Sequence, residues 1–267
     1  MRLTTLICCA VLALSTSLVA AEEPDSDAAL RRATAAVEAD PQSVQARFAR
    51  GQLYESLRQY DAAVADYDEV LRLDPMDVAG WSARGGAHFK LGRIEESIAD
   101  WDRQIELSSR DEAGHWRRGI SHYYAGRYED GRKQFEGYQT VDDADVENAV
   151  WRYLCMAQAE SAAAAQEDLL KIGDDRRVPM RQVYELFAGR QTPDDVLAAA
   201  LAGEPDEATL NQRLFYAELY IGLWHEAQGD AAAALEHIAR AEGHQIGHYM
   251  WDVARVHAER LRRGAER

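Results

Sequence analysis

The residues best suited to chemistry are three histidines near the carboxyl end of the chain. His237, His244 and His248 lie close to Glu236 and Glu242, and zinc accepts imidazole and carboxylate ligands. Two histidines four residues apart share one face only when their segment is helical. The intervening sequence, GHQIG, favours a turn, and no His-Glu-x-x-His motif occurs. We expect no metal and no cofactor, and we keep a metal-binding or hydrolytic protein that uses these histidines as an alternative.

A cysteine and an acidic run are the other candidates. Arg152 is the only nearby cation that could lower the pKa of the Cys155 thiol, so we interpret Cys155 as a small packing residue. The acidic run at residues 142–147 lacks the glycine and the twelfth-position glutamate of a calcium loop, and we expect a solvated turn there. Gly-x-Ser-x-Gly, Walker and dinucleotide glycine motifs are absent. The sequence therefore predicts no catalytic residue and no enzyme.

The elements that carry these residues follow from an internal repeat. Three segments align without a gap and share Gly51, Gly85 and Gly119, which recur every 34 residues. A helix-turn-helix unit of this length is the tetratricopeptide repeat, TPR, which the sequence resembles. Residues 118–131 crowd a histidine, three tyrosines and three glycines. In this register they form most of a first helix, a turn and the start of a second helix.

Each shared position of the repeat has a packing role. We expect the glycines where the two helices of a repeat cross most closely, because a side chain there would push the helices apart. A small residue follows twelve positions later, across the crossing, and an aromatic residue then fills the space before the next repeat. The small residues are Ala63, Ser97 and Gly131, and the aromatic residues are Tyr67, Trp101 and Phe135.

The repeat also gives the predicted organisation of the chain. No run alternates with a period of two, so we expect an all-α TPR helical solenoid with an inner groove lined by the first helix of each repeat. Trp151, Leu154 and Cys155 match the Trp-x-x-Leu-Gly motif, with Cys155 in the glycine position. The predicted parts are a signal peptide (1–21), a partial repeat (27–41), three repeats (44–77, 78–111 and 112–145), a degenerate helical region (146–205), a late TPR-like repeat (206–248) and a capping helix (249–263).

This order of parts resembles the NlpI-type periplasmic TPR lipoproteins of bacteria. The resemblance is most specific in residues 118–127, 151–154, 183–187 and 215–234. It implies an adaptor that brings cell-wall hydrolases or a protease together and has no chemistry of its own.

An arginine precedes each repeated glycine, where the general pattern has an apolar residue. Asp66 and Asp100 lie on second helices, at a height that the arginine of the next repeat could reach. We therefore predict ion pairs between repeats, from Arg84 to Asp66 and from Arg118 to Asp100.

The concave groove is the predicted binding site, because its aromatic lining is wider than a fold requires. With one lysine and no asparagine at the relevant positions, it does not suit a clamp for a peptide's terminal carboxylate. An extended or helical segment that inserts apolar side chains fits better. Coverage of this surface by the chain's own C-terminal helices is the alternative. The predicted groove residues are Phe48, Gln52, Phe89, Lys90, Trp116, Ile120, Tyr123 and Tyr124.

The amino-terminal segment and the charge indicate where the chain acts. Arg2, an apolar run and small residues at Ala20 and Ala21 have the layout of a secretory signal peptide, so we expect export to the periplasm or the medium. Cys8 lies early in the apolar run and follows Ile7 rather than a small residue, so we do not expect a lipid anchor. The formal net charge of −16 disfavours nucleic acid and membrane surfaces as partners.

Together these features predict a non-enzymatic, exported adaptor that binds envelope or secreted proteins through its groove. A self-assembling structural protein, for example a homodimer, is a further alternative.

Overall fold

The structure is a computed structural model that describes residues 23–108 and 112–265, and these ranges are helical with no strand. The predicted all-α class is confirmed for them. The helices are α1 (Glu23–Ala39), α2 (Val44–Ser56), α3 (Tyr60–Leu73), α4 (Val78–Lys90), α5 (Ile94–Leu107), α6 (Trp116–Tyr124), α7 (Tyr128–Tyr138), α8 (Val146–Ala159), α9 (Ala162–Glu167), α10 (Met180–Phe187), α11 (Pro193–Leu201), α12 (Glu207–Ala227), α13 (Ala231–Gly243) and α14 (Tyr249–Ala265).

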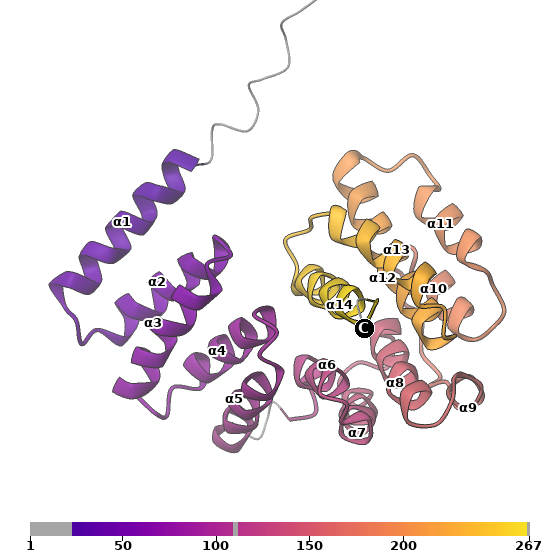
Figure 1. Ribbon diagram of the computed structural model, residues 1–267, viewed down its shortest axis with the longest axis horizontal. Helices are drawn as coiled ribbons and strands as arrows, with labels where there is room; N and C mark the ends of the chain where they lie inside the picture. Colours follow the sequence, from indigo (N-terminus) through magenta and orange to yellow (C-terminus); the bar gives the residue numbers. More distant parts are fainter. Residues whose placement is uncertain (1–22, 109–111, 266–267) are drawn as a thin grey trace, which may run out of the picture.

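The helices follow a curve, and its two arms face each other (Figure 1). Helices α1 to α5 form one arm, α10 to α13 lie in the other, and α6 to α8 join the arms. The last helix, α14, lies on the inner side of this curve.

Helices α2 to α7 form three pairs that begin and turn in the same way. The first helix of each pair starts at a side chain that accepts a hydrogen bond from a backbone N–H in the first turn, which satisfies a donor that the helix itself cannot. The connection to the second helix contains a residue with positive φ, and Arg58 adopts this conformation where the later repeats have glycine. The caps are Ser43, Asp77 and His115, and the turn residues are Arg58 (φ 58°), Gly92 (φ 72°) and Gly126 (φ 73°).

The repeated glycines lie against an aromatic ring sixteen residues later in the same repeat, which confirms the predicted close crossing. The rings also reach the following repeat as predicted, since the Trp101 centroid lies 5.3 Å from that of His115. Each ring therefore joins the two helices of its own repeat and the next repeat. An added Cβ would lie 2.6 Å from Tyr67 at Gly51, 2.7 Å from Trp101 at Gly85 and 2.7 Å from Phe135 at Gly119.

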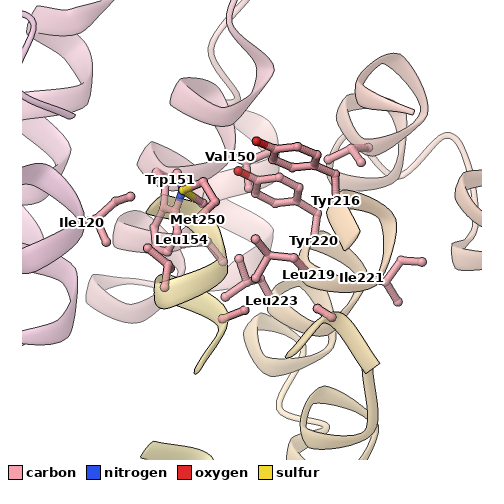
Figure 2. Packing of buried hydrophobic residues seen from close by; sticks show 14 of the residues in the cluster. Ile120, Val150, Trp151, Leu154, Tyr216, Leu219, Tyr220, Ile221, Leu223 and Met250 are labelled. Carbon is pink, nitrogen blue, oxygen red and sulfur yellow. The ribbon is translucent and has the colours of Figure 1, made fainter. Parts of the chain in front are cut away.

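One continuous hydrophobic core runs from the second repeat to α14. Near its middle, Trp151 of α8 lies beside Met250 of α14, and the stacked rings of Tyr216 and Tyr220 project from α12 (Figure 2). A smaller cluster around Tyr67 forms the core of the first repeat. The middle of the chain and α14 therefore share a core with the second and third repeats.

Four arginines on the first helices bond the side chain sixteen residues later, in their own helix pair. Arg84, Arg118 and Arg152 also bond the side chain sixteen residues earlier, and so link their pair to the preceding one. Arg152 of α8 extends the series into the region that the sequence left irregular, since it bonds Glu136 at 3.0 Å and Asp168 at 2.6 Å. We call these residues the arginine row: Arg50, Arg84, Arg118 and Arg152.

The predicted partners within the row were wrong. Arg84 forms a bidentate ion pair with Asp100 of its own repeat, at 2.7 and 2.9 Å. It also bonds Asp68 of the preceding repeat at 2.6 Å. Arg118 reaches back to Asp102 rather than to Asp100. The antiparallel hairpin places the residue sixteen positions later directly opposite the arginine, so Asp66 is already paired with Arg50.

The predicted register of Cys155 was also wrong. Because Arg152 continues the arginine row, the residue that corresponds to the repeated glycines is Tyr153, two positions before Cys155. Cys155 instead packs against the preceding repeat, where a Cβ added to Gly131 would lie 2.8 Å from its Sγ. Cys155 is fully buried, and burial raises the pKa of its thiol well above its ordinary value, as expected for a packing residue.

Neighbouring glycines in α4 should respond in opposite ways to alanine. Gly85→Ala places a methyl group 2.7 Å from Trp101 and should lower the free energy of unfolding by about 1–3 kcal/mol. Gly86→Ala meets no described atom within 4 Å and should raise it by about 0.5–1 kcal/mol, because alanine costs less backbone entropy in a helix. Urea denaturation measures both values, and equal losses would contradict the close crossing.

A double-mutant cycle should identify the partner of Arg84. The effects of Arg84→Gln and Asp100→Asn on the free energy of unfolding should couple by about 1–3 kcal/mol, since the two side chains form a largely buried bidentate ion pair. Arg84→Gln and Asp66→Asn should be additive within about 0.5 kcal/mol. Stronger coupling to Asp66 in urea denaturation would favour the pairing predicted from the sequence.

Candidate functional site

The start of α14 lies inside the groove formed by the first helices. The ring centroid of Tyr249 lies 5.3 Å from that of Phe89 and 5.4 Å from that of Trp116. Tyr124 packs edge-on against Phe89 at 5.5 Å. The aromatic lining predicted from the sequence is therefore present, and a ring of the chain itself is packed into it.

Polar contacts hold the same part of α14 against the first two repeats. The Tyr60 hydroxyl donates a hydrogen bond of 2.8 Å to Asp252, and Arg255 donates to the carbonyl oxygen of Lys90. The guanidinium of Arg58 lies 3.8 Å from the centre of the Trp251 ring. These residues are more than 160 positions apart in the sequence, so the contacts tie the two arms of the curve together.

Further along α14, a buried network joins it to α6 and α12. The Tyr124 hydroxyl lies 2.9 Å from His257 Nδ1, and the Tyr123 hydroxyl donates to Glu226 at 3.0 Å. Glu226 also pairs with Arg260, and its Oε2 lies 3.2 Å from His257 Nε2 without a well-aligned hydrogen bond. The histidine of this network, His257, is completely buried.

The environment shifts the pKa values of this network. Burial alone would raise the pKa of Glu226, but His257, Arg260 and the Tyr123 hydroxyl lower it to about 2. Burial lowers the pKa of His257 below its ordinary value, and this outweighs the opposing effect of Glu226. The network therefore holds an ionised carboxylate beside a neutral imidazole at neutral pH.

The predicted groove residues fall into two groups. Phe89, Ile120 and Tyr123 are buried, and Tyr124 is half-buried beside α14, so the chain itself covers this half of the groove. The remaining residues keep some exposure: Gln52 is exposed, and Phe48, Lys90 and Trp116 are half-buried. That all eight bind a partner stays a prediction.

The other half of the groove is open. A cavity of about 690 Å³ lies between α2, α4 and the start of α14, and Phe48, Glu55 and Ser82 are among its lining residues. Arg117 also lines it, with its guanidinium 5.1 Å from the Trp116 ring and 5.2 Å from the Tyr249 ring. Within the described ranges Arg117 makes no ion pair, so the cavity has a cation available for an acidic group.

The late histidines lie apart and have separate partners. Residues 244–248 are not helical, as the sequence indicated, and His244 contacts Asn211 at 2.9 Å. His237 pairs with Glu218 at 2.6 Å, and His248 contacts Tyr216 at 3.4 Å. No group of three metal-ligating side chains is found in the part of the chain that the structure describes.

The predictions for the amino-terminal segment lie outside the described residues. They concern the signal peptide at residues 1–21, its cleavage after Ala20 or Ala21, and Cys8 and Cys9. Over residues 23–108 and 112–265, no helix is both long and apolar enough to cross a membrane.

Sequence reasoning missed the groove-facing residues of α14. It treated this helix as a cap with one apolar side, but the first turns are buried on all sides, including Trp251, Asp252 and His257. The signal was the aromatic start of the helix, Tyr249-Met250-Trp251, because a cap needs a polar outer face.

The stability of the fold should fall as the pH is lowered from 7.5 to 5. A folded-state pKa below the ordinary value of 6.5 means that His257 is protonated in the unfolded state first. Each such histidine costs at most about 1.4 kcal/mol per pH unit. The contribution of Glu226 is present above its ordinary pKa and disappears only as the pH falls toward 2.

His257→Gln isolates the share of the buried imidazole. Glutamine does not titrate, so the pH dependence of the free energy of unfolding should become shallower whatever the variant's stability at pH 7.5. Denaturant titrations at pH 7.5, 6 and 5 measure it. An unchanged pH dependence would show that folding does not shift the pKa of His257.

The comparisons with known proteins establish the fold. The model of the tetratricopeptide repeat family matches residues 12–58 and 48–112. No curated protein matches the sequence. Within the described residues, the matched segments include the first two helix pairs of the solenoid.

Solved structures share this architecture at low sequence identity. A tetratricopeptide repeat protein from Parabacteroides merdae is 18% identical, with a TM-score of 0.51 over 87% of this chain and 77% of that one. MamA is 17% identical, with a TM-score of 0.50 over 54% of this chain and 85% of that one. A chain of the APC/C hetero-tetramer Cut9–Hcn1 is 12% identical, with a TM-score of 0.51 over 90% of this chain and 46% of that one. The chain therefore has a TPR solenoid fold.

Proposed function

We propose that the chain is a non-enzymatic adaptor that binds a segment of a partner protein in the open half of its groove. The observation that carries this proposal is the cavity of about 690 Å³ between α2, α4 and the start of α14. Tetratricopeptide repeats present such concave surfaces, and a curved solenoid offers them to an extended or helical segment.

The open half of the groove indicates the chemistry of the segment. Phe48 offers an apolar surface at one end, and Arg117 offers a cation that lies beside two aromatic rings at the other. The Lys90 ammonium pairs with Glu55 and lies 3.9 Å from Asp252, so its charge is not available to a ligand as that of Arg117 is. We infer a segment that carries an apolar side chain and a carboxylate.

The place of action is part of the proposal. The amino-terminal sequence supports export to the periplasm or the medium, and the order of parts supports an NlpI-type role beside cell-wall hydrolases or a protease. Cell fractionation with amino-terminal sequencing tests export. A protein that is retained in the cytoplasm with residues 1–21 intact would overturn this part of the proposal.

Arg117→Glu tests binding in the open half of the groove. Cross-linking and pull-down from the native envelope should recover the partner at least tenfold less with this variant, because a carboxylate then meets a carboxylate. Arg72→Glu makes the same charge change on an exposed position of α3, outside the cavity lining, and should recover as much as wild type. Equal recovery with both variants would exclude this half of the groove.

A further inference from the structure

A second cavity, of about 470 Å³, lies on the other side of Trp116, between the third repeat and α8. Its walls come from α6, α7, α8, the two connections that flank α8 and α9, and the start of α14. Trp151 and Met250, which lie side by side in Figure 2, both belong to this lining. Among the described residues, the linings of this cavity and of the open half of the groove share only His248.

Two buried polar groups in this lining have no partner. Asn148 is 4% exposed, and its Oδ1 accepts no hydrogen bond from any described residue. Trp151, one turn later in α8, is 2% exposed, and its Nε1–H has no acceptor in the same described ranges. A buried polar group without a partner costs roughly 1–3 kcal/mol. Both costs disappear when the two side chains turn toward a ligand in the cavity that supplies a donor to Asn148 and an acceptor to Trp151.

The charges around the cavity favour a cation. Five carboxylates line it against two arginines, and Arg177 is already bound by Asp145 at 2.5 Å and Glu147 at 2.7 Å. Asp142 accepts a hydrogen bond from the Ala144 N–H at 2.9 Å but has no ion pair with any residue that the structure describes. The five carboxylates are those of Asp142, Asp145, Glu147, Asp174 and Asp175.

The remaining walls are aromatic. Phe135 and Trp151 are stacked with their centroids 6.4 Å apart, and Trp116 and Tyr138 also line the cavity. Aromatic faces attract organic cations and pack against aliphatic chains. An alkyl chain that ends in a positive charge matches both the walls and the excess of carboxylates.

We propose that this cavity binds a lysine or arginine residue of a peptide segment. Asn148 Oδ1 accepts a hydrogen bond from the ammonium or guanidinium group, and Asp142 supplies the opposing charge. Trp151 Nε1–H donates to a peptide carbonyl oxygen of the same ligand. The aliphatic part of the side chain packs against the aromatic walls.

Titration with single-residue ligands tests the proposal on the full chain. N-acetyl-lysine N-methylamide should shift the indole N–H resonance of Trp151, one of six tryptophans, with a Kd on the order of 1 mM for so small a ligand. N-acetyl-norleucine N-methylamide, which lacks the charge, should bind at least tenfold more weakly. Equal binding of the norleucine ligand, or tighter binding of the glutamate analogue, would overturn the proposal.

Free n-butylamine separates a peptide residue from a small amine. It carries the same charge but no peptide carbonyl, so it should bind at least threefold more weakly and leave the Trp151 indole resonance unshifted. If n-butylamine binds as tightly as the lysine ligand, the peptide part of the proposal fails.

Two variants test the residues. Asn148→Leu should weaken lysine-ligand binding at least tenfold while the Tm stays equal or rises, because it removes an unpartnered polar group from the interior. A loss of Tm with unchanged binding would assign Asn148 a structural role and overturn the proposal.

Asp142→Asn keeps the hydrogen bond to Ala144 and removes only the charge, so binding should weaken about threefold to tenfold. Asp74→Asn is its matched control, because Asp74 accepts the same kind of hydrogen bond from Met76 at 3.0 Å and lies outside the cavity lining. Equal binding by Asp142→Asn and Asp74→Asn would contradict a charge-reading cavity.

Discussion

The close contact between a glycine on one helix and an aromatic ring sixteen residues later is the constraint on which the solenoid depends. At Gly85 the ring of Trp101 lies so near that a methyl group would collide with it. The next residue toward the amino terminus, Arg84, then lies opposite Asp100 and within reach of Asp68. One contact thus sets the crossing of the hairpin, and the adjacent ion pairs tie that hairpin to the one before it. Repetition every 34 residues gives the concave surface.

The repeats could be predicted from the sequence because their contacts are local and periodic. Glycines 34 residues apart indicate the helix pairs, since the contacts that require them lie within one hairpin. The ion pairs of Arg84 and Arg118 were harder to predict. On the neighbouring helix, the carboxylate sixteen residues from the arginine and the carboxylate two positions beyond it both lie at a height that the arginine could reach. The spacing of the arginines themselves, which continues to Arg152, would have shown the register of α8.

The position of α14 could not be predicted from periodicity. Its contacts join Tyr249 to Phe89 and Asp252 to Tyr60, and no repeated spacing relates these residues. An amphipathic pattern shows that a helix buries one face, but it does not show which surface it packs against. The aromatic lining of the concave surface could therefore be predicted from the sequence, while the division of that surface into a covered half and an open half required the structure.

The polar network at His257 and the cavity beside Asn148 show two ways in which this interior treats polar groups. In the network, Tyr123, Tyr124, His257, Glu226 and Arg260 satisfy most of one another's hydrogen-bonding capacity. At the cavity, the lining residues Asn148 and Trp151 each keep one buried polar atom without a hydrogen-bond partner among the described residues. The network is suited to holding helices together, and the cavity is suited to binding a ligand.

The short non-helical link at residues 244–248 separates α14 from α13 and gives α14 a degree of independence. Detachment of this one helix would break its contacts with Tyr60, Phe89 and Tyr124 while every glycine–ring contact of the repeats stays formed. Such an opening is a sub-global event with a free energy below that of complete unfolding. The solenoid thus combines repeats held by their nearest neighbours with a terminal helix held by long-range contacts, and release of that helix would expose the part of the groove that Phe89 and Tyr124 line.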